Sequence, residues 1–137
     1  MSDIKITGKK YIKTINKEFQ TKFPYLMLSF MTPVEWEKSR NQEGKSKALS
    51  GKTKLSDVRT VTPKSSSEIS IHGSTKIKNL ENNFFKIYGL HAQVCYADKN
   101  GKFYYTGEKS DEFTLSQLNK QMEERGMQKN PRVDSYK

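Results

Sequence analysis

Two groups of basic residues are the most distinctive chemical feature of this chain. One group has the spacing of a single helix face, and the other lies in a polar stretch that we expect to form a long loop at residues 38–54. Basic side chains gathered in this way neutralise phosphates, which makes both groups candidates for contact with DNA or RNA. The candidate residues are Lys9, Lys10, Lys13, Lys17, Arg40, Lys45, Lys47 and Lys52.

The type of basic residue indicates the type of contact. Lysine outnumbers arginine by 21 to four, whereas bidentate recognition of bases usually employs arginine. We therefore expect contacts to the phosphate backbone with little sequence specificity. Trp36 lies near these residues and is a candidate for stacking on an unpaired base, although anchoring its own loop is the simpler interpretation. A solvated helix face followed by a polar loop is the simpler interpretation of the lysines, and the sequence leaves it open.

The chain contains no recognisable catalytic or cofactor-binding motif. Glycine-rich nucleotide-binding loops, the HExxH pair and the GxSxG elbow are all absent from the sequence. Two histidines and one cysteine do not make a zinc site. His91 and Cys95 share one face of an expected strand but are roughly 13 Å apart along it. We therefore expect no enzyme activity, no catalytic residue, no cofactor, no metal and no small-molecule substrate.

The composition limits the size and class of the protein. The 137 residues carry a net charge of +10, with 33% hydrophobic and 29% charged residues, so we expect one domain or two very small ones. The first 67 residues hold 14 Lys and Arg against six Asp and Glu, and residues 68–137 hold 11 against nine. The excess of positive charge thus belongs to the first half. Since neither a membrane span nor a secretory signal is visible, we expect a cytoplasmic protein.

The elements that must position the lysines come from an internal repeat. An offset of 65 places residues 4–23 over residues 69–88, and an offset of 64 continues the match after Pro24. The coinciding apolar pairs include Ile4 and Ile69, Ile6 and Ile71, Ile12 and Ile77, Ile15 and Leu80, Phe19 and Phe84, and Phe23 and Tyr88. We predict a tandem duplication of a β-α-β-β-α unit, with copies at residues 1–61 and 68–126, a linker at 62–67 and a flexible tail at 127–137.

Periodicity predicts the elements of each copy. Residues 4–7 and 69–72 alternate as strands do, and the apolar residues that follow recur at helical spacing until Pro24 in one copy and Gly89 in the other. Residues 26–30 and 90–96 alternate again. Asn100 and Gly101 predict a two-residue hairpin with positive φ at both positions, and Thr114 with Gln117 predicts a capping box that opens a last helix. The fold class is therefore α+β. We expect one continuous antiparallel or mixed sheet with the helices packed on one face.

The second face of that sheet suggests a different class of function. If Leu28 and its neighbours point to the core, the outward residues are Met27, Ser29, Met31, His91, Gln93 and Cys95. Such a face is covered either by another layer of the chain or by a partner. The alternative to nucleic-acid binding is therefore a protein–protein interaction or structural module that uses its sheet faces or edges, including association with itself as a homodimer.

Overall fold

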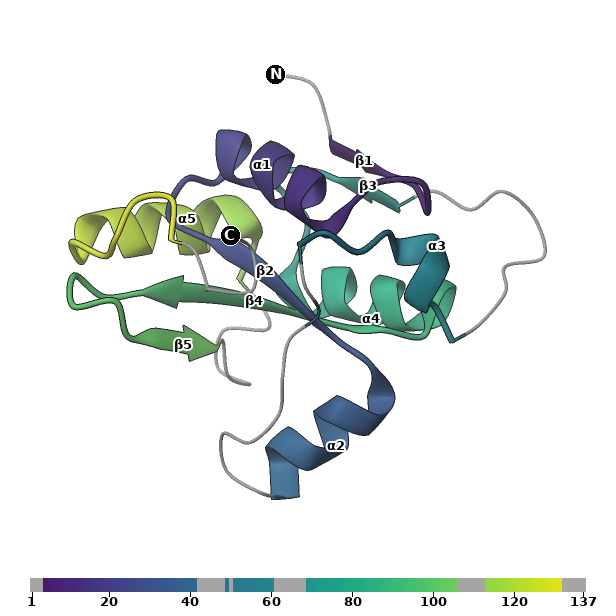
Figure 1. Ribbon diagram of the computed structural model, residues 1–137. Coiled ribbons are helices and arrows are strands. Elements are labelled where there is room, and N and C mark those ends of the chain that lie inside the picture. Colours follow the sequence, from purple (N-terminus) through teal and green to yellow (C-terminus); the bar gives the residue numbers. More distant parts are fainter. Residues whose placement is uncertain (1–3, 42–48, 50, 61–68, 106–112, 132–137) are drawn as a thin grey trace.

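The computed structural model describes residues 4–41, 49, 51–60, 69–105 and 113–131. The protein is a mixed α+β fold in which two small antiparallel sheets and the longer helices together enclose the core (Figure 1). In chain order the described elements are β1 (Ile4–Ile6), α1 (Ile12–Lys22), β2 (Met27–Met31), α2 (Pro33–Asn41), α3 (Leu55–Val58), β3 (Ile69–Ile71), α4 (Ile77–Tyr88), β4 (His91–Ala97), β5 (Phe103–Tyr105) and α5 (Leu115–Glu124).

The strands form two sheets, so the expectation of one continuous sheet is wrong for the described residues. One sheet pairs β1 with β3, and the other has the order β2-β4-β5. Lys5 lies opposite Ser70 at the centre of the first pairing, and Ser29 lies opposite Gln93 at the centre of the second. These central pairs have the offsets of 65 and 64 that relate the two halves in sequence. Each described strand of the first half therefore pairs with its own counterpart in the second half, in antiparallel register.

The apolar stripes of the two long helices are buried as predicted. Ile12, Phe19, Ile77 and Phe84 are each 0% exposed and belong to one core cluster. The helices also end where the sequence predicts. Gly89 takes the left-handed conformation at the end of α4 (φ 67°), and α1 stops two residues before Pro24. One shared hydrophobic core thus holds both halves together.

The long helices begin on backbone contacts instead of side-chain caps. In the first half, Ile12 N–H donates to the Thr53 carbonyl (2.8 Å) and Leu55 N–H donates to the Lys10 carbonyl (3.3 Å). The first amide of each helix is therefore satisfied by a carbonyl two residues before the start of the other helix. The second half repeats this between α4 and α5, through the bonds Ile77 N–H to Phe113 O and Leu115 N–H to Thr75 O.

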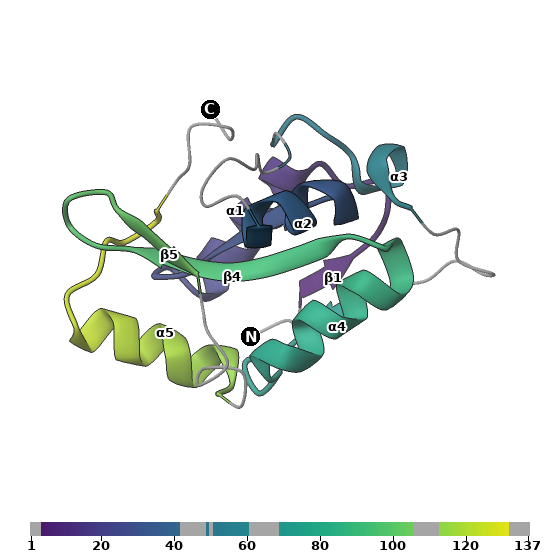
Figure 2. The same ribbon diagram turned by 90° about the horizontal axis from the view of Figure 1, so that it is seen from below.

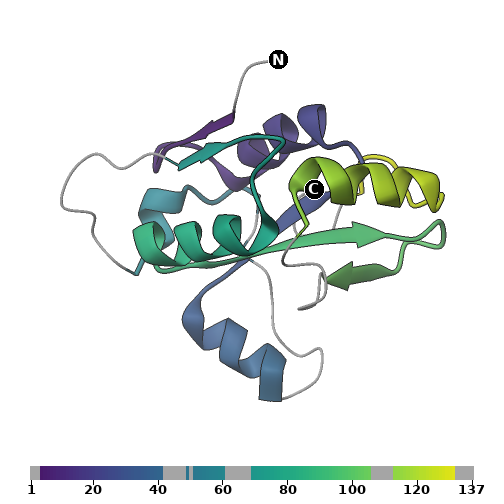
Figure 3. The ribbon, with the colours of Figure 1, turned by 180° about the vertical axis from the view of Figure 1, so that it is seen from behind.

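The first half departs from the predicted order of elements at α2. Residues 33–41 form a helix, so residues 38–41 of the expected basic loop are helical. Glu35 N–H donates to the Thr32 hydroxyl (3.3 Å) and Trp36 N–H to the Thr32 carbonyl (2.9 Å), which makes Thr32 the residue that opens the helix. The helix projects from the end of β2, away from β1 and β3 (Figures 1 and 3). The expected turn at residues 43–45 lies outside the described residues.

The second half follows the predicted order β3-α4-β4-β5-α5, with a different hairpin. Gly101 has positive φ (86°), as predicted. The hydrogen bond that closes the loop runs from Asp98 N–H to the Lys102 carbonyl, so the connection is longer than the predicted two residues. Asn100 does not have positive φ. The geometry is that of a turn followed by a left-handed glycine. The predicted capping box of Thr114 and Gln117 is confirmed at the start of α5.

The outward face of the larger sheet is covered. Met27, Ser29, Met31 and Cys95 are at most 3% exposed, so these outward residues are buried within the protein. Both α4 and α5 follow one side of β4 (Figure 2). Trp36 of α2 instead stacks on His91, one of the outward residues, with ring centroids 4.6 Å apart. The expectation that all helices pack on one face is therefore wrong for α2.

Residues 127–131, which we call the strap, are bonded to the fold. Gln128 N–H donates to the Ala97 carbonyl (2.8 Å), and Asn130 N–H donates to the Pro24 carbonyl (2.6 Å). The strap follows α5 and is the yellow segment of Figure 1. Of the tail expected at residues 127–137, the part that the structure describes is thus docked between the two halves.

Candidate anion-binding groove

A groove of about 940 Å³ lies between α1 and the strap. Its first wall is formed by α1, which contributes Lys13, Thr14, Asn16, Lys17, Gln20 and Thr21. Its floor is formed by Pro24 and Met27, and its second wall by Lys129, Asn130 and Pro131. We call this space the α1 groove. Three of its lining residues are lysines, and none of the described lining residues is acidic.

Hydrogen bonds fix both sides of the groove to its floor. The Asn16 amide donates to the Leu28 carbonyl (2.9 Å) and accepts from Leu28 N–H (2.8 Å), which attaches α1 to β2. The Gln20 amide donates to the Pro131 carbonyl (2.7 Å), which attaches the strap to α1. The walls are therefore held in place by side chains that are themselves part of the lining, and Lys13, Lys17 and Lys129 remain exposed between them.

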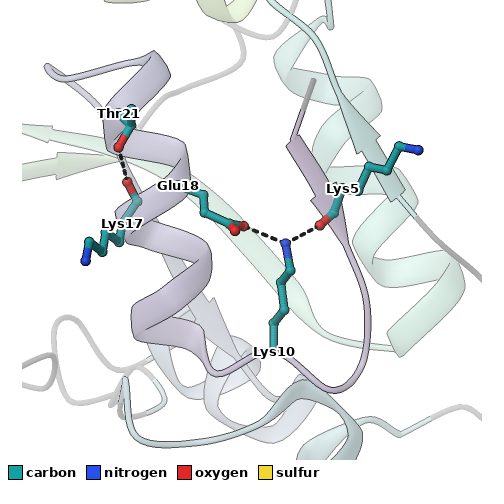
Figure 4. A network of polar contacts seen from close by, with 5 residues as sticks. All are labelled: Lys5, Lys10, Lys17, Glu18 and Thr21. Carbon is teal, nitrogen blue, oxygen red and sulfur yellow. Dashed lines mark hydrogen bonds and ion pairs between the residues drawn. The ribbon is translucent and has the colours of Figure 1, made fainter. Parts of the chain in front are cut away.

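The predicted helix-face lysines separate into two sets. Lys13 and Lys17 line the groove, as the helical spacing predicts. Lys10 instead donates to the Glu18 carboxylate and to the Lys5 carbonyl, both at 2.6 Å, on the side of α1 that faces β1. Figure 4 shows Lys17 pointing away from this network. Lys10 precedes the helix, so the helical spacing that places Lys13 and Lys17 does not apply to it.

The remaining predicted residues are not brought to the groove. Lys9 is exposed in the turn before α1, and Lys52 is exposed beside Gly51, whose carbonyl accepts from Lys13 N–H. Arg40 lies in α2, while Lys45 and Lys47 lie outside the described residues. Trp36 stacks on His91 at an interplanar angle of 13°, so its ring packs against the protein's own sheet.

Sequence reasoning missed Lys129. It placed this residue in a tail because residues 127–137 have neither periodicity nor an apolar run. The hydrogen bonds of Gln128, Asn130 and Pro131 dock the strap and so bring Lys129 beside α1. Asn130 has positive φ (54°), a conformation that asparagine tolerates better than most residues. No local pattern of apolar residues predicts that a segment of this kind docks on the fold.

The corresponding place in the second half has different chemistry. The sequence offsets place Glu81 at the position of Asn16, Phe85 at that of Gln20 and His91 at that of Met27. His91 lies between the rings of Trp36 (4.6 Å) and Phe85 (4.7 Å). The second half therefore presents a carboxylate and an aromatic stack where the first half presents an open basic groove. An anion is attracted to the first place and not to the second.

The single cysteine, Cys95, is buried and unreactive. Burial raises the pKa of the Cys95 thiol to about 12, and its Sγ donates to the Met27 carbonyl (3.5 Å). A thiol in this state is not a nucleophile near neutral pH. Within the described part of the chain, His, Cys, Asp and Glu nowhere gather in a group of three that would hold a metal ion.

Comparisons with protein-family models, curated proteins and solved structures found no match for this chain. Among the described helices, none has the length and apolar character needed to cross a membrane.

Proposed function

We propose that this is a non-enzymatic, cytoplasmic nucleic-acid-binding protein that holds the phosphate backbone in the α1 groove with little sequence preference. The observation that carries the proposal is the convergence of Lys13, Lys17 and Lys129 on one groove without a carboxylate among the described lining residues. Positive charge in a concave site raises the local concentration of anions. The lysines come from two segments more than 100 residues apart in sequence, and their convergence is a property of the fold.

The groove also sets the expected strength of binding. Three lysines neutralise about three phosphates, for which the log–log salt slope is roughly −2 to −3. This slope is shallower than the value for the whole set of lysines and arginines singled out in the sequence. Since no aromatic ring lines the groove among the described residues, base stacking does not contribute there. We expect dissociation constants of about 10⁻⁴–10⁻⁶ M at physiological salt.

We also infer that the two halves are a tandem duplication of one β-α-β-β-α unit, whose copies have diverged at the groove. The central strand pairs at the sequence offsets, and the matching contacts at the helix starts, support this. Lys13 has a lysine counterpart, Lys78, but Lys17 corresponds to Asn82. Binding is therefore assigned to the first copy alone.

The test is a fluorescence-anisotropy titration with labelled oligonucleotides at two salt concentrations. We expect Lys13→Glu with Lys17→Glu to abolish binding. The matched control is Lys86→Glu with Lys120→Glu, which changes the charge equally at exposed sites outside the groove. We expect this control to weaken binding less than about twofold, because distant charges are screened. Equal losses in both double variants would show that only the net charge matters and would contradict the proposal.

A protein-interaction module remains the second candidate, on a different surface from the one first expected. Val34 is 65% exposed and Phe85 is 48% exposed, on α2 and α4 respectively. Phe85 contacts His91, on which Trp36 stacks, so α2 and α4 meet in one aromatic cluster at the beginning of β4. Sedimentation separates the candidates. A homodimer that Phe85→Ser dissociates, together with no binding to nucleic acid, would favour this alternative.

A further inference from the structure

The α1 groove has cations on both of its walls, and this deepens the proposed function, on which the following inference rests. Lys13 and Lys17 are four residues apart on α1 and so lie on one side of the groove, about 6 Å apart along the helix axis. Lys129 lies on the other side, on the strap. A phosphate chain that follows α1 is therefore contacted from two directions at once.

The second wall distinguishes between single strands and duplexes. In a duplex, one side of each strand is occupied by its paired complement, so the protein meets only the outer side. A flat helix face with lysines suffices for such a contact. Two facing walls suit a chain that is accessible from both sides, and a single strand is such a chain.

The floor of the groove agrees with a chain that is bound by its backbone. Pro24 and Met27 form an uncharged floor, while Thr14 and Asn130 add side chains capable of hydrogen bonding to phosphate oxygens. The described lining holds no ring on which a base would stack. The bases therefore point out of the groove and are not read.

We propose that the α1 groove binds one single phosphodiester strand, and that the strap supplies the second wall through Lys129. The strap is bonded to both halves, through Ala97 on one side and Pro24 on the other. It is therefore a fixed part of the site. Lys129 is a binding residue specific to single strands, whereas Lys13 and Lys17 serve any phosphate backbone that approaches α1.

The experiment compares two labelled probes over a series of salt concentrations, an oligothymidylate of about 16 nucleotides and a duplex of matched length. We expect the 137-residue chain to bind the single strand at least about tenfold more tightly than the duplex. We expect Lys129→Glu to weaken single-strand binding by about fivefold or more and duplex binding by less than about twofold, and to reduce the salt slope for the single strand by about one. Lys120→Glu is the matched control and should change neither.

The outcomes separate this inference from the function on which it rests. If the duplex binds as tightly as the single strand and Lys129→Glu has no effect, while Lys13→Glu with Lys17→Glu abolishes binding, the single-strand inference is wrong and the nucleic-acid function stands. If neither probe binds, both fail. Polyglutamate is added as a competitor. If it displaces the oligothymidylate at equal charge concentration, the groove recognises acidic chains in general, and the inference is overturned.

Discussion

At the scale of single residues, the most informative side chain is Asn16, which is 7% exposed within the apolar stripe of α1. Its amide makes two hydrogen bonds to Leu28, one to the carbonyl and one to the N–H. These bonds occupy both main-chain groups of a residue in β2, on a strand that β4 flanks on its other side. The Asn16 amide therefore satisfies the N–H and the carbonyl of Leu28, as the backbone of a neighbouring strand would.

Asn16→Ala is expected to destabilise the fold by about 2–4 kcal/mol, because it leaves a buried donor and a buried acceptor without partners. The free energy of unfolding from urea titration measures this. Asn82→Ala is the matched control, since Asn82 is an exposed asparagine in α4 and gains the same helix propensity. It should change the free energy by less than about 0.5 kcal/mol. Equal values for the two variants would show that the Leu28 bonds contribute nothing.

Sequence reasoning succeeded at residues where periodicity applies and failed where it does not. The stripe that contains Ile12, Phe19 and their counterparts was predictable, because burial of one helix face fixes the spacing of apolar residues. Lys10 was placed with Lys13 and Lys17, but it precedes the helix and pairs with Glu18. Asn16 was not singled out, because a polar residue beside a stripe does not reveal that a strand edge lies opposite it.

At the scale of elements, α2 and the β4–β5 hairpin show which local signals were overlooked. Thr32, Pro33 and Glu35 have the order of a helix start, with a hydroxyl cap, proline at the first position and an acidic third residue. This pattern was available in the sequence and would have predicted α2. In the hairpin, Asn100 and Gly101 suggested two positive φ angles, but the Asp98 carboxylate accepts from the N–H groups of Asn100 and Lys102 (both 2.9 Å) and selects a longer loop.

The hairpin loop is expected to depend on pH through Asp98. The pKa of Asp98 lies below 3.8 in the folded protein. The hydrogen bond from Lys102 N–H lowers it most, and the bond from Asn100 N–H lowers it further. Because the pKa is lower in the folded state, the carboxylate stabilises the loop above its ordinary pKa, and this contribution is lost as the pH falls through the lowered value. NMR titration of the Asp98 carboxyl carbon measures the shift directly.

The matched variants for this prediction are Asp98→Asn and Asp98→Ala. Asparagine keeps an acceptor for the two amides without a charge, so we expect Asp98→Asn to retain the loop and to lose its pH dependence. Asp98→Ala should abolish the protection of the Asn100 and Lys102 amides from hydrogen exchange. A carboxyl pKa at or above 3.8 in the folded protein would contradict the role assigned to these bonds.

At the scale of the whole molecule, the two halves depend on each other for their sheets. The described strands of the first half, β1 and β2, pair only with β3 and β4 of the second half. The halves also exchange covering segments. From the first half, α2 places Trp36 on His91, and from the second half, the strap bonds to Gln20 and Pro24. Sequence periodicity identifies each copy, but it contains no signal for pairing between copies, so the predicted single sheet could not be corrected before the structure was known.

This exchange predicts that neither half folds alone. A fragment of residues 1–61 has no described partner for either strand, and a fragment of residues 68–126 retains only the β4–β5 pairing, which is marginal in isolation. We expect both fragments to lack dispersed amide NMR spectra when separate and to recover one folded species when mixed in equal amounts. Cutting the chain within residues 62–67 should likewise leave a stable complex, because the described strand pairings between the halves involve other residues. If residues 68–126 fold as a monomer, the second copy is an independent domain, and the covering of His91 by α2 is not needed for its stability.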